Sequence, residues 1–118
     1  MGKLTTHVLD TAHGCPAAGM TVTLLAIGAD GSATSLSSLR LDQDGRAGGP
    51  LLEGENLQHG RYRLVFGVGA YFAARGVALP DPPFLDEVPL DFGVADTHAH
   101  YHVPLLVSPW SYSTYRGS

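Results

Sequence analysis

The stretch His100–Ser118, with the sequence HYHVPLLVSPWSYSTYRGS, decides which fold the chain can adopt. From His98 to Val107 apolar and polar side chains alternate with a period of two, which is typical of a strand with one buried face. One face carries only apolar or amphipathic residues, namely Ala99, Tyr101, Val103, Leu105 and Val107. The other face includes three imidazoles and consists of His98, His100, His102, Pro104 and Leu106. We therefore expect the first face to lie in a core and the second to lie outside it.

Ser108-Pro109 should end this strand, because proline cannot donate a hydrogen bond to a sheet. The following residues, Ser111–Arg116, can form a short return strand. Its two faces would be Ser111, Ser113 and Tyr115 on one side, and Trp110, Tyr112 and Thr114 on the other. Such a hairpin would bring a tyrosine and several hydroxyl groups beside His102.

The rest of the chain consists of short alternating segments that are separated by turns about every ten residues. The expected strands are Leu4–Asp10, Met20–Ile27, Thr34–Leu41, Gly60–Gly67 and Asp86–Ala95. Helix-forming residues cluster only in Val68–Gly76, which predicts one short helix, and Pro89 points to an edge strand or a bulge. The pattern predicts an all-β fold: an antiparallel sandwich of seven to eight strands in a single domain, residues 1–118.

Composition narrows the classes of function. Charged residues make up only 15% of the chain, against roughly 25% in an ordinary soluble domain, so part of the surface is expected to be buried against other subunits. Seven Lys and Arg residues against eleven Asp and Glu residues give a net charge of −4. Such a chain has no electrostatic reason to bind nucleic acid or an anionic membrane.

Sequence features related to location point to the cytoplasm. A single cysteine, Cys15, excludes an internal disulfide. No apolar run approaches eighteen residues, so no membrane span is expected. The first ten residues, MGKLTTHVLD, lack the apolar stretch of a secretory signal, and we expect a cytoplasmic protein.

The C-terminal block resembles a known family. YHVPLL at Tyr101–Leu106, the following SP and the terminal YRGS are similar to 5-hydroxyisourate hydrolase, the enzyme branch of the transthyretin-like family. THVLDTAHGCPAAGM at Thr6–Met20, DGR at 44–46 and YRLVF at Tyr62–Phe66 extend the resemblance over essentially the whole chain. Transthyretin itself is the transport relative and lacks both the histidine pair and the YRGS ending. The resemblance therefore implies a transthyretin-like sandwich that assembles as a homotetramer, with sites between its dimers.

The resemblance also implies the site residues. The catalytic groups of the family fall on His7 in THVLD, Arg46 in DGR and His102 in YHVPLL, and Tyr115 lines the substrate site with Ser113 on the same strand face. The implied substrate, 5-hydroxyisourate, is an oxidised purine whose cyclic amide C–N bond is opened by water. A neutral imidazole suits the removal of a proton from water, and a guanidinium suits a flat anionic heterocycle. The sequence leaves open which histidine is the base.

Two other classes of function remain at this stage. His98, His100 and His102 alternate on one strand face, which is a legitimate ligand spacing for a zinc-dependent hydrolase. A non-catalytic carrier of a small aromatic ligand, of the transthyretin type, is the other alternative. We expect no cofactor and no metal, because an imidazole and a guanidinium already supply a base and an anion partner.

Overall fold

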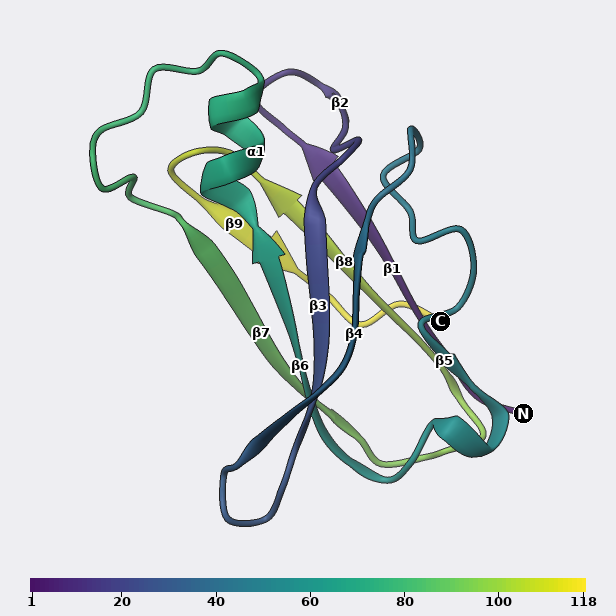
Figure 1. Cartoon of the computed structure of the whole chain (residues 1–118). Coiled ribbons are helices and arrows are strands. Elements are labelled where there is room, and N and C mark those ends of the chain that lie inside the picture. The colour runs from purple at the N-terminus through teal and green to yellow at the C-terminus, as the bar shows by residue number, and fades with distance from the viewer.

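We describe the protein from a computed structural model that covers residues 1–118. Two β-sheets pack face to face, with a helix at one end (Figure 1). The strands are β1 (Lys3–Asp10), β2 (Cys15–Pro16), β3 (Thr21–Ile27), β4 (Ala33–Arg40), β5 (Leu52–Glu53), β6 (Gly60–Gly67), β7 (Glu87–Val94), β8 (His100–Val107) and β9 (Tyr112–Thr114). One α-helix, α1 (Val68–Ala74), follows β6, and a 3₁₀ turn, η1 (Gly54–Asn56), follows β5.

The predicted sandwich is confirmed. One sheet has the order β2-β1-β8-β9, with β5 also paired to β1, and the other has the order β4-β3-β6-β7. Every pair is antiparallel except the central pair β1–β8, which runs parallel. Three of the nine strands, β2, β5 and β9, have only two or three residues, which brings the number above the expected seven to eight.

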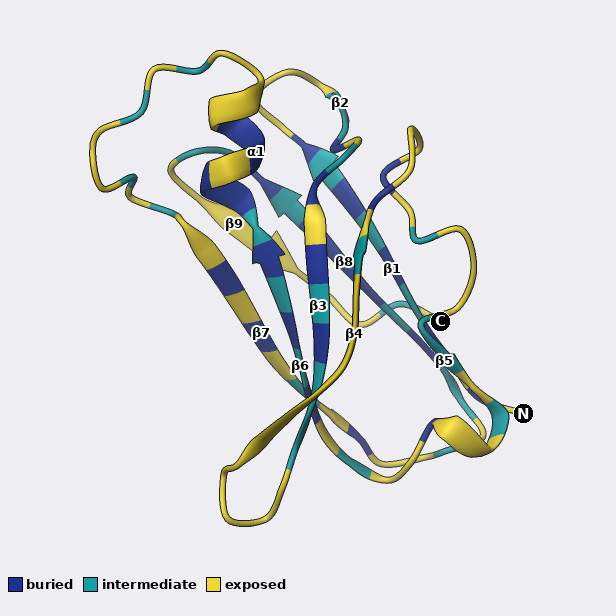
Figure 2. Cartoon of the chain, in the orientation of Figure 1, coloured by how far each residue is buried: buried dark blue, intermediate teal, exposed yellow.

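The core lies between the sheets and follows the alternation of the sequence. In β1, Leu4 and Val8 are fully buried, and in β8, Leu105 and Val107 are fully buried. Figure 2 shows the resulting change of dark blue and teal along these strands. One hydrophobic cluster of 21 buried residues, which includes Phe72 of the helix, joins both sheets into the same core. The expected inward face of the C-terminal strand is therefore confirmed for Tyr101, Val103, Leu105 and Val107.

Two local features of the second sheet follow from special residues. β7 is an edge strand that pairs only with β6, as expected from Pro89. An edge strand tolerates proline, because one of its sides has no neighbouring strand that needs an N–H donor. Gly67 joins β6 to the helix at a crowded point, because a Cβ there would lie 2.3 Å from the Thr21 hydroxyl oxygen. No helix in the structure combines the length and hydropathy that a membrane crossing requires.

One expectation about β8 is wrong. The strand begins at His100, whereas His98 lies in the preceding turn and is exposed. The Asp96 carboxylate accepts a hydrogen bond from the His98 N–H at 2.9 Å, which is the geometry of an Asx turn. This local bond competes with strand pairing, so the imidazole of His98 does not continue the outward face of β8.

Candidate active site

The outward face of the β1–β8 pair holds the candidate site. In the parallel register, Thr5 lies opposite His102 and His7 lies opposite Pro104. Since their neighbours Leu4, Thr6 and Val8 point into the core, Thr5 and His7 must point outward. The four outward polar residues are half-buried, namely Thr5, His7, His100 and His102.

Two histidines of β8 meet on one hydroxyl of β1. The Thr5 hydroxyl oxygen lies 2.8 Å from Nε2 of His100 and 2.8 Å from Nδ1 of His102. The two imidazole rings are 6.2 Å apart, centre to centre, at an angle of 66°. The ring of His102 is therefore oriented by a specific hydrogen bond, which leaves its Nε2 free of any partner within the protein.

Arg46 reaches this face from the other side of β1. A tight loop carries it there: the Asp42 carboxylate accepts hydrogen bonds from the backbone N–H groups of Asp44 and Arg46, at 2.9 and 3.1 Å. Gly45 has φ +72°, and a Cβ on it would lie 2.5 Å from the Val8 carbonyl oxygen. Only glycine lets the loop pack this closely on β1. An isolated antiparallel bridge then pairs Arg46 with His7.

The C-terminal residues dock along the opposite edge of β8. Thr114 donates its hydroxyl to the Pro104 carbonyl oxygen at 2.7 Å. The guanidinium of Arg116 lies 4.5 Å from the centre of the Tyr101 ring, a cation–π distance, and donates to the His100 carbonyl oxygen at 3.3 Å. Gly117 then pairs with His102. The YRGS ending thus runs along the edge of β8, beside His100 and His102.

Charge around His102 favours the neutral imidazole. Burial lowers the pKa of His102 below its usual 6.5, and the positive charges of Arg46, His100 and His7 lower it further. His100 meets His102 at the Thr5 hydroxyl, and His7 pairs with Arg46 on the same sheet. A neutral ring near pH 7 has a lone pair available, which is the property that a general base needs.

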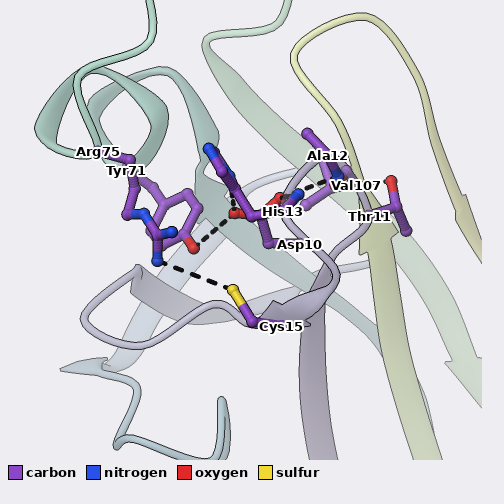
Figure 3. A network of polar contacts seen from close by, with 8 residues as sticks. All are labelled: Asp10, Thr11, Ala12, His13, Cys15, Tyr71, Arg75 and Val107. Carbon is purple, nitrogen blue, oxygen red and sulfur yellow. Dashed lines mark hydrogen bonds and ion pairs between the residues drawn. The ribbon is translucent and has the colours of Figure 1, made fainter.

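A buried carboxylate anchors the end of β1, as Figure 3 shows. Asp10 is 1% exposed and accepts hydrogen bonds from the N–H groups of Ala12 and His13, from the His13 ring and from the Tyr71 hydroxyl. Burial opposes ionisation of Asp10, but the hydrogen bonds from His13 and Tyr71 outweigh it, so the pKa lies below 3.8. Burial, together with the bond to Asp10, raises the pKa of Tyr71 well above 10. This network ties α1 to the strand that carries His7.

The structure brings only some of the predicted site residues together. His7, Arg46 and His102 share one face. Ser113 lies opposite Leu106 farther along the sheet, and Tyr115, 58% exposed, lines a cavity of about 330 Å³ at the free edge near β7. Neither Ser113 nor Tyr115 forms a hydrogen bond to a histidine of the chain. The hollow that Tyr115 lines contains none of His7, Arg46 and His102.

The sequence analysis missed two residues that contact His102, namely Thr5 and Gly117. The structure also weakens the proposal of a zinc site on His98, His100 and His102. Thr5 and Gly117 contact His102 directly, but only the β1–β8 and β8–C-terminus pairings reveal this. A local signal exists for Gly117, as the small residue of YRGS, and none exists for Thr5. No group of three His, Cys, Asp or Glu side chains has the arrangement of a metal site, and the expected row of three imidazoles loses His98.

Comparison with known proteins identifies the family of the chain. Residues 4–117 match the sequence pattern described as the HIUase/Transthyretin family. The chain is 61% identical to a protein named 5-hydroxyisourate hydrolase from Ralstonia nicotianae, over the full length of both.

Solved structures show the same fold. The chain superimposes on the 5-hydroxyisourate hydrolase of Klebsiella pneumoniae with a TM-score of 0.82 at 35% identity, over all of both chains. It superimposes on an (S)-allantoin synthase with a TM-score of 0.93 at 48% identity, and there it spans 44% of the longer chain. A thyroxine complex of sea bream transthyretin matches with a TM-score of 0.86 at 28% identity, over 98% of this chain and 94% of the other.

Proposed function

The chain belongs to the HIUase/Transthyretin family, and on that premise we propose that it is the hydrolase of 5-hydroxyisourate, acting as a single transthyretin-like domain over residues 1–118. The full-length identity of 61% with a 5-hydroxyisourate hydrolase supports the enzyme branch over the transport branch. The observation that carries the proposal is the cluster of His7, Arg46 and a half-buried His102 on one sheet face, where burial lowers the pKa of His102.

The reaction is the opening of a cyclic amide by water. His102 takes a proton from a water molecule, whose oxygen attacks the amide carbonyl carbon of the six-membered ring. The C–N bond then breaks, the carbonyl carbon becomes a carboxylate, and the proton is returned to the leaving nitrogen. The product is 2-oxo-4-hydroxy-4-carboxy-5-ureidoimidazoline. We assign the base to His102, since its lowered pKa and its oriented ring support that role.

Arg46 and His7 complete the catalytic set. The planar guanidinium of Arg46 binds the flat, acidic heterocycle and offsets the negative charge that develops on the attacked carbonyl oxygen. His7, paired with Arg46 across the bridge, orients the water or donates to the leaving nitrogen. Tyr115 and Ser113 contact the substrate, and we propose that they do so across an interface between protomers.

The assembly that closes the site is a homotetramer. An outward sheet face is open to water and makes a poor pocket for a small ring, so a second copy has to cover it. The free edges of β7 and β9 and several exposed large apolar side chains support this proposal. These side chains are Phe84, Trp110, Tyr112 and Tyr115.

A turnover assay tests the proposal directly. Freshly generated 5-hydroxyisourate is mixed with the protein, and the loss of its ultraviolet absorbance is followed against a blank without protein. Acceleration supports the hydrolase. Tight binding of small aromatic ligands without any acceleration would favour the carrier alternative, which the similarity to sea bream transthyretin keeps in view. Activity lost on chelation and restored by zinc would favour the metal-dependent alternative.

A further inference from the structure

Thr5 holds a hydroxyl group between two imidazole rings, and the reaction proposed above assigns it no part. Its oxygen lies 2.8 Å from Nε2 of His100 and 2.8 Å from Nδ1 of His102. Both distances are those of good hydrogen bonds. Thr5 comes from β1 and the two histidines from β8, so the contact spans the centre of the sheet.

Counting protons leaves two arrangements. A hydroxyl has one proton, so Thr5 can donate to one ring nitrogen and must accept from the other. If His102 donates from Nδ1, Thr5 donates to Nε2 of His100, and Nε2 of His102 keeps its lone pair. If His100 donates from Nε2, Thr5 donates to Nδ1 of His102, and the proton of a neutral His102 then sits on Nε2.

We propose that Thr5 is a positioning residue that accepts a hydrogen bond from the Nδ1–H of His102 and donates its own hydroxyl hydrogen bond to Nε2 of His100, and so keeps Nε2 of His102 unprotonated and free to act as the base. The role of His102 as a base rests on the proposed function. The tautomer of His102 does not, because it is a property of the protein without substrate. His100 acts on His102 through Thr5, because it accepts the hydrogen bond that sets the direction of the Thr5 hydroxyl.

Electrostatics favours this direction. Of the titratable groups that act on His102, namely Arg46, His100 and His7, Arg46 is the permanent charge, and it opposes additional positive charge on the ring. His100 is neutral in this arrangement, because it accepts the Thr5 hydrogen bond at Nε2. A proton on Nδ1 faces the neutral oxygen of Thr5. Nδ1 faces Thr5, so Nε2 is the nitrogen left open on the face that Arg46 shares through its bridge to His7, and positive surroundings favour a lone pair there over an N–H. In histidine sites, the hydrogen bond that one ring nitrogen makes decides whether the other nitrogen carries a proton or a free lone pair.

The test reads the tautomer directly. Protein labelled with ¹⁵N-histidine gives separate ring shifts for protonated and unprotonated nitrogens, and the His102 signals are identified by their loss in His102→Asn. In the wild type at neutral pH we expect a protonated Nδ1 and an unprotonated Nε2. Thr5→Val keeps the branched shape without the hydroxyl and should abolish this preference, and Thr5→Ser should retain it. A proton on Nε2 in the wild type, or an unchanged preference in Thr5→Val, would overturn the inference.

Kinetics provide the second readout. Thr5→Val should lower kcat at least about tenfold with little change in KM, because the base is mis-protonated while the substrate contacts remain. Thr5→Ser should restore kcat. Thr23→Val, which removes a hydroxyl from the other sheet, is the matched control and should leave kcat unchanged. An unchanged kcat in Thr5→Val would contradict the positioning role. If the wild type proves inactive on 5-hydroxyisourate, the proposed function fails, whereas the ring shifts still decide the tautomer.

Discussion

Gly117 and His102 face each other across a two-bond antiparallel bridge. The His102 N–H donates to the Gly117 carbonyl oxygen at 3.2 Å, and the Gly117 N–H donates to the His102 carbonyl oxygen at 2.7 Å. A Cβ at Gly117 would lie 3.1 Å from Cβ and 3.2 Å from Cδ2 of His102. The penultimate residue of the chain therefore packs directly on the candidate base.

Gly117→Ala should lower turnover more than stability. The added methyl group has to push the His102 ring by a few tenths of an ångström, and such misplacement of a catalytic group reduces rate steeply. We expect kcat to fall by about tenfold or more, with the far-ultraviolet circular dichroism unchanged. Gly49→Ala, at an exposed glycine where a Cβ meets nothing within 4 Å, is the control. Equal turnover in the two variants would mean that this contact does not position the ring.

His102→Asn should abolish most of the activity and leave the fold intact. The side chain is half-buried on the outward face, so its replacement opens no cavity in the core. Loss of a general base typically lowers the rate by about 10²–10⁴. His7→Asn should act similarly, and the double variant should be less than additive if the two imidazoles serve one step. A folded His102→Asn protein with near wild-type kcat would place the chemistry elsewhere.

The acid limb of the activity profile should lie below the usual histidine value. Protonation of His102 removes the base, and its pKa is lowered by burial and then by Arg46, so activity should persist at pH 6.5 and fall only below it. Arg46→Gln removes the cation and should move the midpoint of His102 upward, towards about 6.5. The ring proton shifts of His102, followed by NMR across pH, measure this even where kcat is low. A wild-type midpoint above 6.5 would contradict the electrostatic account.

The Asp10–Tyr71 bond should matter for stability. Tyr71→Phe removes one donor to a buried carboxylate and should lower the free energy of unfolding by about 1–3 kcal/mol. Because the folded pKa of Asp10 is lowered, its contribution is fully present above the unfolded value of about 3.9 and is lost as pH falls through the folded pKa. Denaturant titrations of wild type and Asp10→Asn should therefore converge in acid.

Asp91→Asn is the matched control for that experiment, since Asp91 pairs with Arg63 on the open surface. Its effect on stability should be much smaller, because exposed ion pairs contribute little. Coincident denaturation curves for Asp10→Asn and Asp91→Asn at neutral pH would show that the buried network contributes no more to stability than an exposed ion pair.

Assembly should be required for activity. Leu106 lies on the outward face, half-buried, opposite Ser113. Leu106→Asp places an unpaired charge where a second copy would pack, and it should yield smaller species with little turnover and a native dichroism spectrum. Light scattering at several concentrations measures the mass. A fully active monomer, of wild type or of this variant, would contradict the proposed tetrameric site.

Local patterns in the sequence determined the two faces of the strands. In β8, period-two alternation placed Leu105 inward and His100 and His102 outward, because a strand turns successive side chains to opposite sides whatever its neighbours are. Pro89 marked an edge strand for a similarly local reason. The resemblance of YHVPLL and YRGS then indicated the family, and 61% identity to a full-length relative agrees with it.

Only the tertiary structure decided which residues meet on the outward face. Thr5 reaches His100 and His102 across 95 and 97 positions of sequence, through a parallel register that no local pattern encodes. Arg46 reaches His7 because Gly45 packs against the Val8 carbonyl, a contact between a loop and a strand that lie far apart in the sequence. Each of these outcomes depends on a hydrogen bond or close contact that exists only after the chain has folded. Strand faces could therefore be predicted from the sequence, whereas the partners of His102 could not.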